Sequence, residues 1–368
     1  MKHYVIPIFV PHLGCPHDCV FCDQQKITSL PRAKGQSVTG RDVERIAGEY
    51  LRSFRDKGAS VEIAFFGGTF TGIPRDIQAD LLHSAQKFLR RGEIAHIRCS
   101  TRPDCIDASG LEFVKSYGMD IIELGVQSLD DDVLLKSGRG HSAASVQAAS
   151  RLILGHGLTL GHQLMLGLPG DSPDKDLESA RRSIEMKPHM VRLYPALVVK
   201  GTPMEAMYSR GEYAPYSLDL AIETCAQIME LYESAGIKVI RAGLQATEEI
   251  RPGRALTAGP YHPAFKELVI SHRFWHKLYL ECLKFQGSFA DHGKLENPGM
   301  INHGIIIGIN PQDISAVYAG GKQYRNLFKD QLAGLGKREF SLQVIQDKTI
   351  ERGTAETEIF GRRMRLYL

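Results

Sequence analysis

The chain has 368 residues, and its 45 Lys and Arg against 42 Asp and Glu give a formal net charge of +3. This length accommodates one large α/β barrel with an appendage, or two domains. So small a net charge neither requires nor excludes a nucleic-acid partner, and any basic footprint must be local. No segment approaches the roughly eighteen apolar residues of a membrane span. With seven cysteines that imply no disulfide framework, we expect a cytoplasmic protein with no membrane partner.

Short runs rich in β-branched and aromatic residues alternate with longer amphipathic stretches in the first half of the chain. The runs predict six strands, at 5–10, 61–66, 96–100, 121–126, 159–166 and 190–197. The stretches predict helices at 41–57, 77–90, 107–117, 143–155 and 175–186. Asp107 and Ser172 are candidate helix N-caps. This alternation is typical of βα units and a parallel sheet, so we predict a partial (β/α)6 barrel in an α/β protein.

Three cysteines follow the first predicted strand in a CxxxCxxC spacing, Cys15, Cys19 and Cys22. A [4Fe-4S] cluster normally takes four cysteines, so three thiolates leave one iron open to an external ligand. An open iron indicates chemistry rather than simple electron transfer. The alternatives are a zinc site completed by His12 or His17, or three unrelated thiols.

Polar and glycine motifs follow two other predicted strands. Gly67, Gly68 and Thr69 come after the second strand, where paired glycines permit either close approach to a ligand or a tight βα turn. Glu123 and Gln127 lie on one face of the fourth strand. Their inward polar groups would contact a bound nucleoside or brace the barrel as a buried network. Because the carboxyl ends of parallel strands meet at one edge of a barrel, we expect these motifs to converge.

Six strings occur in order between residues 15 and 202: Cys-Pro-His-Asp-Cys-Val-Phe-Cys, Phe-Gly-Gly-Thr-Phe, Thr-Arg-Pro-Asp, Glu-Leu-Gly-Val-Gln-Ser, Gly-Arg-Gly-His and Leu-Tyr-Pro-Ala-Leu-Val-Val-Lys-Gly-Thr. Together they resemble the radical S-adenosylmethionine (SAM) domain of the elongator complex catalytic subunit. A Gly-Leu-Pro-Gly turn also resembles, more distantly, oxygen-independent coproporphyrinogen oxidases. The resemblance implies a [4Fe-4S] cluster whose open iron binds SAM, an external electron donor, and a 5′-deoxyadenosyl radical that abstracts hydrogen from substrate.

The resemblance also implies roles for individual residues. Positions matching Gln127, Arg139 and Gln163 contact SAM in the relatives, and the Gly-Gly turn binds its amino group. The candidate cofactor-binding residues are Phe21, Gly67, Gly68, Thr69, Glu123, Gln127, Arg139 and Gln163. Arg139 would pair with the SAM carboxylate; the alternative is that it lies in a surface loop with no role in binding. Tyr194 as a hydrogen relay and Lys200 as an anion partner are the candidate catalytic residues, with purely structural roles as the alternative.

Two departures from the elongator pattern are visible. Ser100 stands before the Thr-Arg-Pro-Asp string, where the relatives carry an acidic residue. No acetyltransferase-like segment is evident after the barrel motifs. If the chain modifies wobble uridine as the relatives do, we therefore expect an acyl carrier or acyltransferase on a partner chain.

After residue 250 the alternation of strand and helix patterns gives way to an irregular stretch rich in Pro and Gly. We therefore predict a barrel at 1–250, a helical connection at 251–300 and a small α+β module at 301–368. In the last part, a strand, a short helix, a Gly-Gly-Lys-Gln loop, a second helix and two strands resemble a KH module, although the second glycine of its GxxG loop is missing. Lys322, Arg325 and Lys329 form a mild basic footprint there, favouring RNA binding. A packing or dimerisation module is the alternative.

The leading hypothesis is a radical SAM enzyme that acts on RNA, specifically tRNA. A radical SAM enzyme acting on a small molecule such as a porphyrinogen is the second hypothesis. A non-catalytic RNA-binding iron–sulfur protein is the third.

Overall fold

The computed structural model describes residues 2–10, 14–17, 19–23, 38–56, 58–244, 250–284, 304–334, 340–359 and 361–368. The chain divides into two compact units, Met1–Pro263 and Ala264–Leu368. None of the helices in these described ranges is long and apolar enough to cross a membrane.

The first unit is built on a half-barrel sheet of seven parallel strands that follow one another in chain order. The strands are β1 (His3–Phe9), β2 (Ser60–Phe66), β3 (His96–Thr101), β4 (Ile121–Gln127), β5 (Thr159–Leu166), β6 (Met190–Pro195) and β8 (Lys238–Ala242). The six predicted strands are confirmed. The seventh strand, β8, was missed because its five residues include two charged ones and give little apolar signal.

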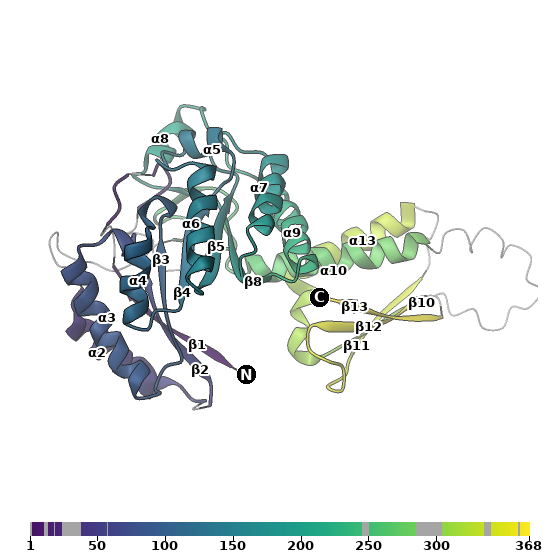
Figure 1. Cartoon of the computed structure of the whole chain (residues 1–368). Helices are drawn as coiled ribbons and strands as arrows, with labels where there is room; N and C mark the ends of the chain where they lie inside the picture. Colours follow the sequence, from purple (N-terminus) through teal and green to yellow (C-terminus); the bar gives the residue numbers. More distant parts are fainter. Residues whose placement is uncertain are drawn as a thin grey trace, which may run out of the picture. The chain divides into compact units, whose positions relative to one another are not determined.

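Helices cover the convex face of this sheet, and Figure 1 shows several of them in front of the strands. The helices of this unit are α2 (Gly40–Ser53), α3 (Arg75–Arg90), α4 (Ala108–Ser116), α5 (Asp131–Lys136), α6 (Ala143–Gly155), α7 (Pro173–Glu185), α8 (Pro203–Ser209) and α9 (Leu218–Ser234). Of these, α5 and α8 lie at the end of the sheet that is uppermost in Figure 1. The Asp107 side chain accepts a hydrogen bond from the Gly110 amide, and the Ser172 side chain accepts one from Lys175. Both predicted N-caps are therefore confirmed.

The opposite, concave face of the sheet carries a buried network of charges. Arg98 on β3 lies 2.7 Å from Glu62 on β2 and 3.0 Å from Glu123 on β4. The Arg192 Nε atom on β6 lies 3.0 Å from the same Glu123 oxygen. Ser100 donates a hydrogen bond of 3.3 Å to the other oxygen of Glu123. The positive charges of two guanidinium groups thus compensate the negative charges of two carboxylates inside the sheet. These ion pairs connect neighbouring strands on a face that is apolar in many parallel sheets.

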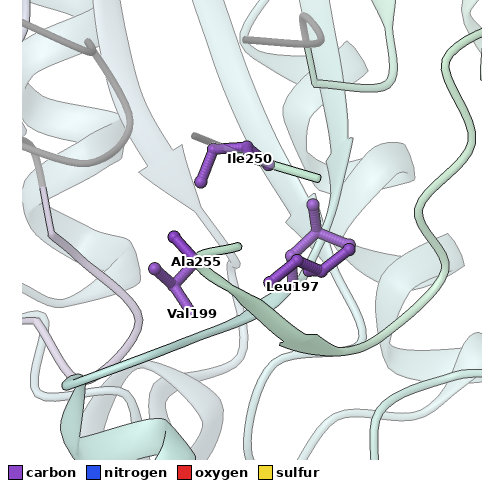
Figure 2. Packing of buried hydrophobic residues seen from close by; sticks show 5 residues of the cluster. Leu197, Val199, Ile250 and Ala255 are labelled. Carbon is purple, nitrogen blue, oxygen red and sulfur yellow. The ribbon is translucent and has the colours of Figure 1, made fainter. Parts of the chain in front are cut away.

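A small cluster of buried apolar side chains lies next to the segment that follows β6. The two-residue strand β7 (Val198–Val199) pairs with β9 (Leu256–Ala258) in an antiparallel ladder. Leu197, Val199, Ile250 and Ala255 pack together beside this ladder (Figure 2). The segment after β6 is therefore held close to the carboxyl edge of the sheet.

The second unit begins with a long helix, α10 (Phe265–Lys284), followed by a mixed sheet in the order β11-β10-β12-β13. Its other elements are β10 (Gly304–Ile309), η4 (Pro311–Asp313), α12 (Ser315–Tyr318), η5 (Ala319–Lys322), α13 (Gln323–Gly334), β11 (Ser341–Gln346), β12 (Thr354–Ile359) and β13 (Arg362–Tyr367). The Trp275 indole donates to the Val317 carbonyl at 3.1 Å and packs on Phe328. Helix α10 belongs to this unit, which begins at Ala264, and the predicted domain bounds at residues 250 and 300 stay predictions.

The strand–helix–loop–helix–strand order predicted for the tail is present. Strand β13 was not predicted, since its alternating arginines hide the strand pattern. Such charged side chains are common on edge strands, where they discourage pairing with other chains.

His162 on β5 provides a test of the convex-face packing. Its ring is fully buried between the Ser150 and Ser183 hydroxyls, at 3.0 and 2.8 Å, and burial lowers the pKa of His162 to about 3. The folded chain therefore stays neutral at this site where the unfolded chain takes up a proton. Stability is retained above the ordinary histidine pKa and is lost as the pH falls toward 3, by up to about 1.4 kcal/mol per pH unit.

We expect His162→Gln to reduce the loss of unfolding free energy as the pH falls below the ordinary histidine pKa. Urea unfolding at several pH values between 8 and 5 should show the wild-type and variant free energies converging as the pH falls. Parallel curves would contradict the assignment.

Candidate cluster and cofactor site

The loop that carries the cysteines is docked on the turn that follows β2. Gly14 has a φ of +73°, and a Cβ atom there would lie 2.3 Å from the Thr69 carbonyl oxygen. Cys15 Sγ and Thr69 Oγ1 are 3.1 Å apart. Glycine is thus required at position 14 both for its left-handed backbone and for space. This contact brings the predicted Gly67–Gly68–Thr69 turn, in which Gly67 has a φ of 87°, against the cysteine motif.

The three thiols lie near enough to influence one another. The Cys22 amide donates to the Cys19 carbonyl at 3.1 Å, which closes a turn between the second and third cysteines. Burial, and then the neighbouring Cys19 and Cys15 thiols, raise the pKa of Cys22 to about 12. Three thiolates at this place therefore need positive charge close by, such as the iron of a cluster supplies.

Two buried guanidinium groups reach Cys19, the most buried cysteine of the motif. Arg139 Nη1 donates to Cys19 Sγ at 3.2 Å, and Arg102 Nη1 lies 3.9 Å from the same sulfur. Arg139 also donates to the Gly125 carbonyl at 2.6 Å. Arg139 was a predicted site residue. Arg102 was missed as one, although its Thr-Arg-Pro-Asp string was recognised, because nothing in the sequence shows which way the side chain points.

Phe21 anchors the cysteine loop on its other side. It packs against two apolar clusters, one with Val133 and Leu168 and one with Val198 and Met204. The backbone of its neighbour Val20 bonds to Ser137 and Met204. Its predicted contact with SAM remains a prediction beside this observed packing role.

Gln127 ends β4 in a conformation that ordinary strand residues avoid. Its φ is +66°, and the pairing of β4 with β5 shifts register between Gly125 and Gln127. Its Oε1 atom is buried, and none of the residues that the structure describes forms a hydrogen bond with it. A strained backbone and an unpartnered buried oxygen are costly, and such features cluster at ligand sites. The geometry therefore favours the predicted role of Gln127 as a cofactor contact.

The remaining predicted residues spread along the concave face and beyond it. Gln163 on β5 is half-buried and pairs in register with Gly125 and Arg192. Tyr194 lies one inward position further on β6, where Arg192 donates to its hydroxyl at 3.4 Å. Glu123 sits in the ion network described above, which is the bracing arrangement that the sequence left open. Lys200 is exposed after β7, and its amide donates to the Ala255 carbonyl at 2.8 Å. Lys322, Arg325 and Lys329 belong to the second unit.

The residues at the carboxyl edge fit a cubane cluster with a nucleoside cofactor beside it. Three residues at this edge have a buried polar atom with no hydrogen-bond partner among the described residues: Gln127 Oε1, Arg139 Nε and His141 Nδ1. Within the described ranges, no three His, Cys, Asp or Glu side chains converge on one metal ion. The cysteines of a cubane do not need to converge in this way, since each binds a different iron. His12, an alternative zinc ligand, lies outside the described residues, while the His17 ring lies against Gly140.

Comparison with known proteins gives the same assignment. Residues 9–182 match the radical SAM superfamily, and residues 188–274 match the radical SAM C-terminal domain. The chain is 28% identical over 321 residues to a tRNA uridine(34) acetyltransferase of Methanocaldococcus jannaschii, covering 76% of this chain and 57% of that protein. It is 26% identical over 261 residues to elongator complex protein 3 of Saccharomyces cerevisiae, covering 60% of this chain and 47% of that protein. The chain thus spans about half the length of these curated relatives.

One solved structure supports the fold. An archaeal Elp3 of Methanocaldococcus infernus, with an N-terminal deletion, matches with a TM-score of 0.59 at 21% identity. The match covers 81% of this chain and 69% of that one.

Gly14→Ala tests the docking of the cysteine loop. The added Cβ would overlap the Thr69 carbonyl and force the loop away, so we expect anaerobic reconstitution to load less than half the iron and sulfide of the wild type. Gly92→Ala is the matched control, because Gly92 has a φ of +70° with nothing within 4 Å of an added Cβ. It should lose about 1–2 kcal/mol of stability from the left-handed backbone and load iron normally. Equal loading of both variants would contradict the role of Gly14.

Proposed function

This chain belongs to the radical SAM enzyme family, whose cofactors are a [4Fe-4S] cluster and SAM, and we propose that it uses them to modify uridine in tRNA. The observations that carry the proposal are the contacts of Cys15 with Thr69 and of Cys19 with Arg139, which in turn lies with Gln127 beside Gly125 at the end of β4. The choice of tRNA is supported by the relatives, which are named as tRNA uridine acetyltransferase and elongator protein.

The chain's own residues divide the work of holding the cofactors. Cys15, Cys19 and Cys22 would bind three irons and leave the fourth to the amino and carboxylate groups of SAM. Gln127 would supply its unpartnered oxygen, and Gln163 its amide, to the same cofactor. When bound, the cluster and SAM supply the 5′-deoxyadenosyl radical that takes hydrogen from substrate. The surrounding strands would limit the access of water to the site, which protects a reactive species.

The concave face beyond the edge would hold the substrate. Tyr194 is 9% exposed and is aligned by Arg192, so its hydroxyl would sit at a fixed place as a hydrogen relay. Arg192 also lies over the Phe66 ring, 4.9 Å from its centroid. Lys200, exposed after β7, would act as the anion partner for a phosphate or carboxylate.

The second unit would contribute RNA affinity. Gly320, Gly321 and Lys322 are three consecutive residues with positive φ in the loop before α13. The Lys322 ammonium and the Arg325 guanidinium flank the Tyr318 ring, at 5.8 and 5.7 Å from its centroid. Two cations and an aromatic face beside a glycine turn suit a nucleic-acid backbone.

Two partners complete the proposal. An external donor would supply the electron, and an acyltransferase activity, where the reaction transfers an acyl group, would come from outside the described residues. Both stay expectations from the resemblance.

The activity test uses the whole chain, reconstituted anaerobically and reduced with dithionite. We expect 5′-deoxyadenosine to form at least tenfold faster with unmodified tRNA and an acyl donor than without tRNA. The same tRNA digested to nucleosides is the control and should not stimulate. Equal rates with and without tRNA, with no mass change in the RNA, would overturn the tRNA proposal while leaving the family assignment intact.

The RNA test uses Lys322→Ala combined with Lys329→Ala. Arg325 is kept because it donates to the Leu342 carbonyl and is partly structural. We expect weaker tRNA binding at low salt, and a salt dependence of log K reduced by about 1.4 if both lysines contact phosphates of a single strand.

Lys348→Ala combined with Arg363→Ala removes the same charge from exposed positions of this unit and is the matched control. Identical affinities and salt slopes for the two double variants would count against RNA binding by this loop.

A further inference from the structure

Arg102 is a buried arginine whose guanidinium group is fixed from three sides. It is 3% exposed. Its Nε and Nη2 atoms donate to the two carboxylate oxygens of Asp104, at 2.9 and 3.0 Å. Nη2 also donates to the Arg139 backbone carbonyl. Nη1 is left to face Cys19 Sγ at 3.9 Å.

The second guanidinium group is positioned through the first. Arg139 is 6% exposed, and its backbone carbonyl is held by Arg102 while its side chain is held by the Gly125 carbonyl. That pairing directs Nη1 of Arg139 to Cys19 Sγ at 3.2 Å. One sulfur therefore receives two cationic donors, whereas the structure gives Cys15 a neutral hydroxyl partner, Thr69.

The charged side chains around Cys19 carry a net positive charge. Arg102 and Arg139 carry two positive charges, and Asp104 compensates one of them. His141 adds no further charge, because burial and then the two guanidinium groups lower its pKa to about 3. Burying an uncompensated cation is costly, so this pocket suits a negatively charged group beside Cys19, such as a cluster held by three thiolates.

We propose that Arg102, clamped by Asp104, is a positioning residue that sets the reduction potential of the cluster through Cys19. It holds Arg139 in place, and together the two guanidinium groups stabilise negative charge at this sulfur. A cubane with three thiolates is already negative, and uptake of one electron from the external donor makes it more so. Hydrogen bonds to cluster sulfurs and nearby charge are two of the factors that set such potentials. Arg102 therefore makes the cluster easier to reduce.

The proposal rests on the cluster of the radical SAM family and not on the RNA substrate. It also separates Arg102 from a merely structural arginine. A structural brace would change stability or iron content when removed but would leave the potential of the loaded cluster alone. A charge acting through Cys19 changes the potential in a direction set by the sign of the charge.

The experiment is a redox titration of the reconstituted full chain without SAM, followed by the EPR signal of the reduced cluster. Arg102→Gln removes a positive charge and should lower the equilibrium constant for reduction at least tenfold, a shift of about 59 mV to lower potential for a one-electron couple. Asp104→Asn removes the opposing negative charge with little change of shape and should shift the potential upward. Arg181→Gln is the control, since Arg181 is exposed and pairs only with Glu178 among the contacts described for it.

Opposite shifts for Arg102→Gln and Asp104→Asn, with an unchanged control, would support the proposal. Unchanged potentials at full iron content would overturn it, and so would shifts of the same sign. If Arg102→Gln fails to hold iron, Asp104→Asn decides alone, because an upward shift supports the proposal and an unchanged or lower potential contradicts it. The reduction potentials are measured without catalytic turnover. A negative result in the tRNA activity assay would therefore not affect this test.

Discussion

The negative charge of three cysteine thiolates, gathered at the end of β1, is the constraint on which this site depends. Burial, and then the neighbouring Cys19 and Cys15 thiols, raise the pKa of Cys22, so this thiol resists ionisation. The fold meets this constraint with positive charge from two directions. A [4Fe-4S] cluster supplies iron, and Arg102 and Arg139 supply buried guanidinium groups at Cys19. The cysteine loop can take this position because Gly14 leaves room for the Thr69 carbonyl.

The sheet makes this arrangement possible by placing several loops at one edge. Since all seven strands are parallel, the residues after β1, β2 and β4 all leave the sheet at its carboxyl edge. The ion network of Glu62, Arg98, Glu123 and Arg192 ties β2, β3, β4 and β6 together beneath that edge. Glu123, Gln127, Gln163 and Tyr194 thus lie on strands, which are more rigid supports for a site than loops.

Much of this architecture follows from local sequence pattern. Five of the six strands before residue 200 have clear apolar runs, whereas β3 reads His-Ile-Arg-Cys-Ser-Thr. The N-caps at Asp107 and Ser172 are visible because their side chains can accept hydrogen bonds from helix amides. The motif residues at strand ends could be placed at one edge because parallel strands leave no other arrangement. Short or charged strands were not predictable in this way, as β8 and β13 show, because burial of a neighbouring strand rather than their own composition makes them strands.

The directions of the side chains could not be predicted from the sequence either. Whether Glu123 faced a ligand or a guanidinium group depended on Arg98 and Arg192, which lie 25 and 69 positions away in the chain (123 − 98 and 192 − 123). Arg102 belongs to a recognised string, yet only the fold shows that it reaches Cys19 and the Arg139 carbonyl. The strained backbone of Gln127 is likewise a product of the β4 bulge, for which the sequence carries no turn residue at that position.

The central claim is that one iron of the cluster has no cysteine ligand and is bound by SAM instead. Its most direct test is the EPR spectrum of the anaerobically reconstituted, reduced chain, recorded with and without SAM. We expect a cubane signal whose g-values shift when SAM is added, because the cofactor binds the open iron itself. A spectrum that ignores SAM, or a protein that holds zinc in place of iron, would contradict the account.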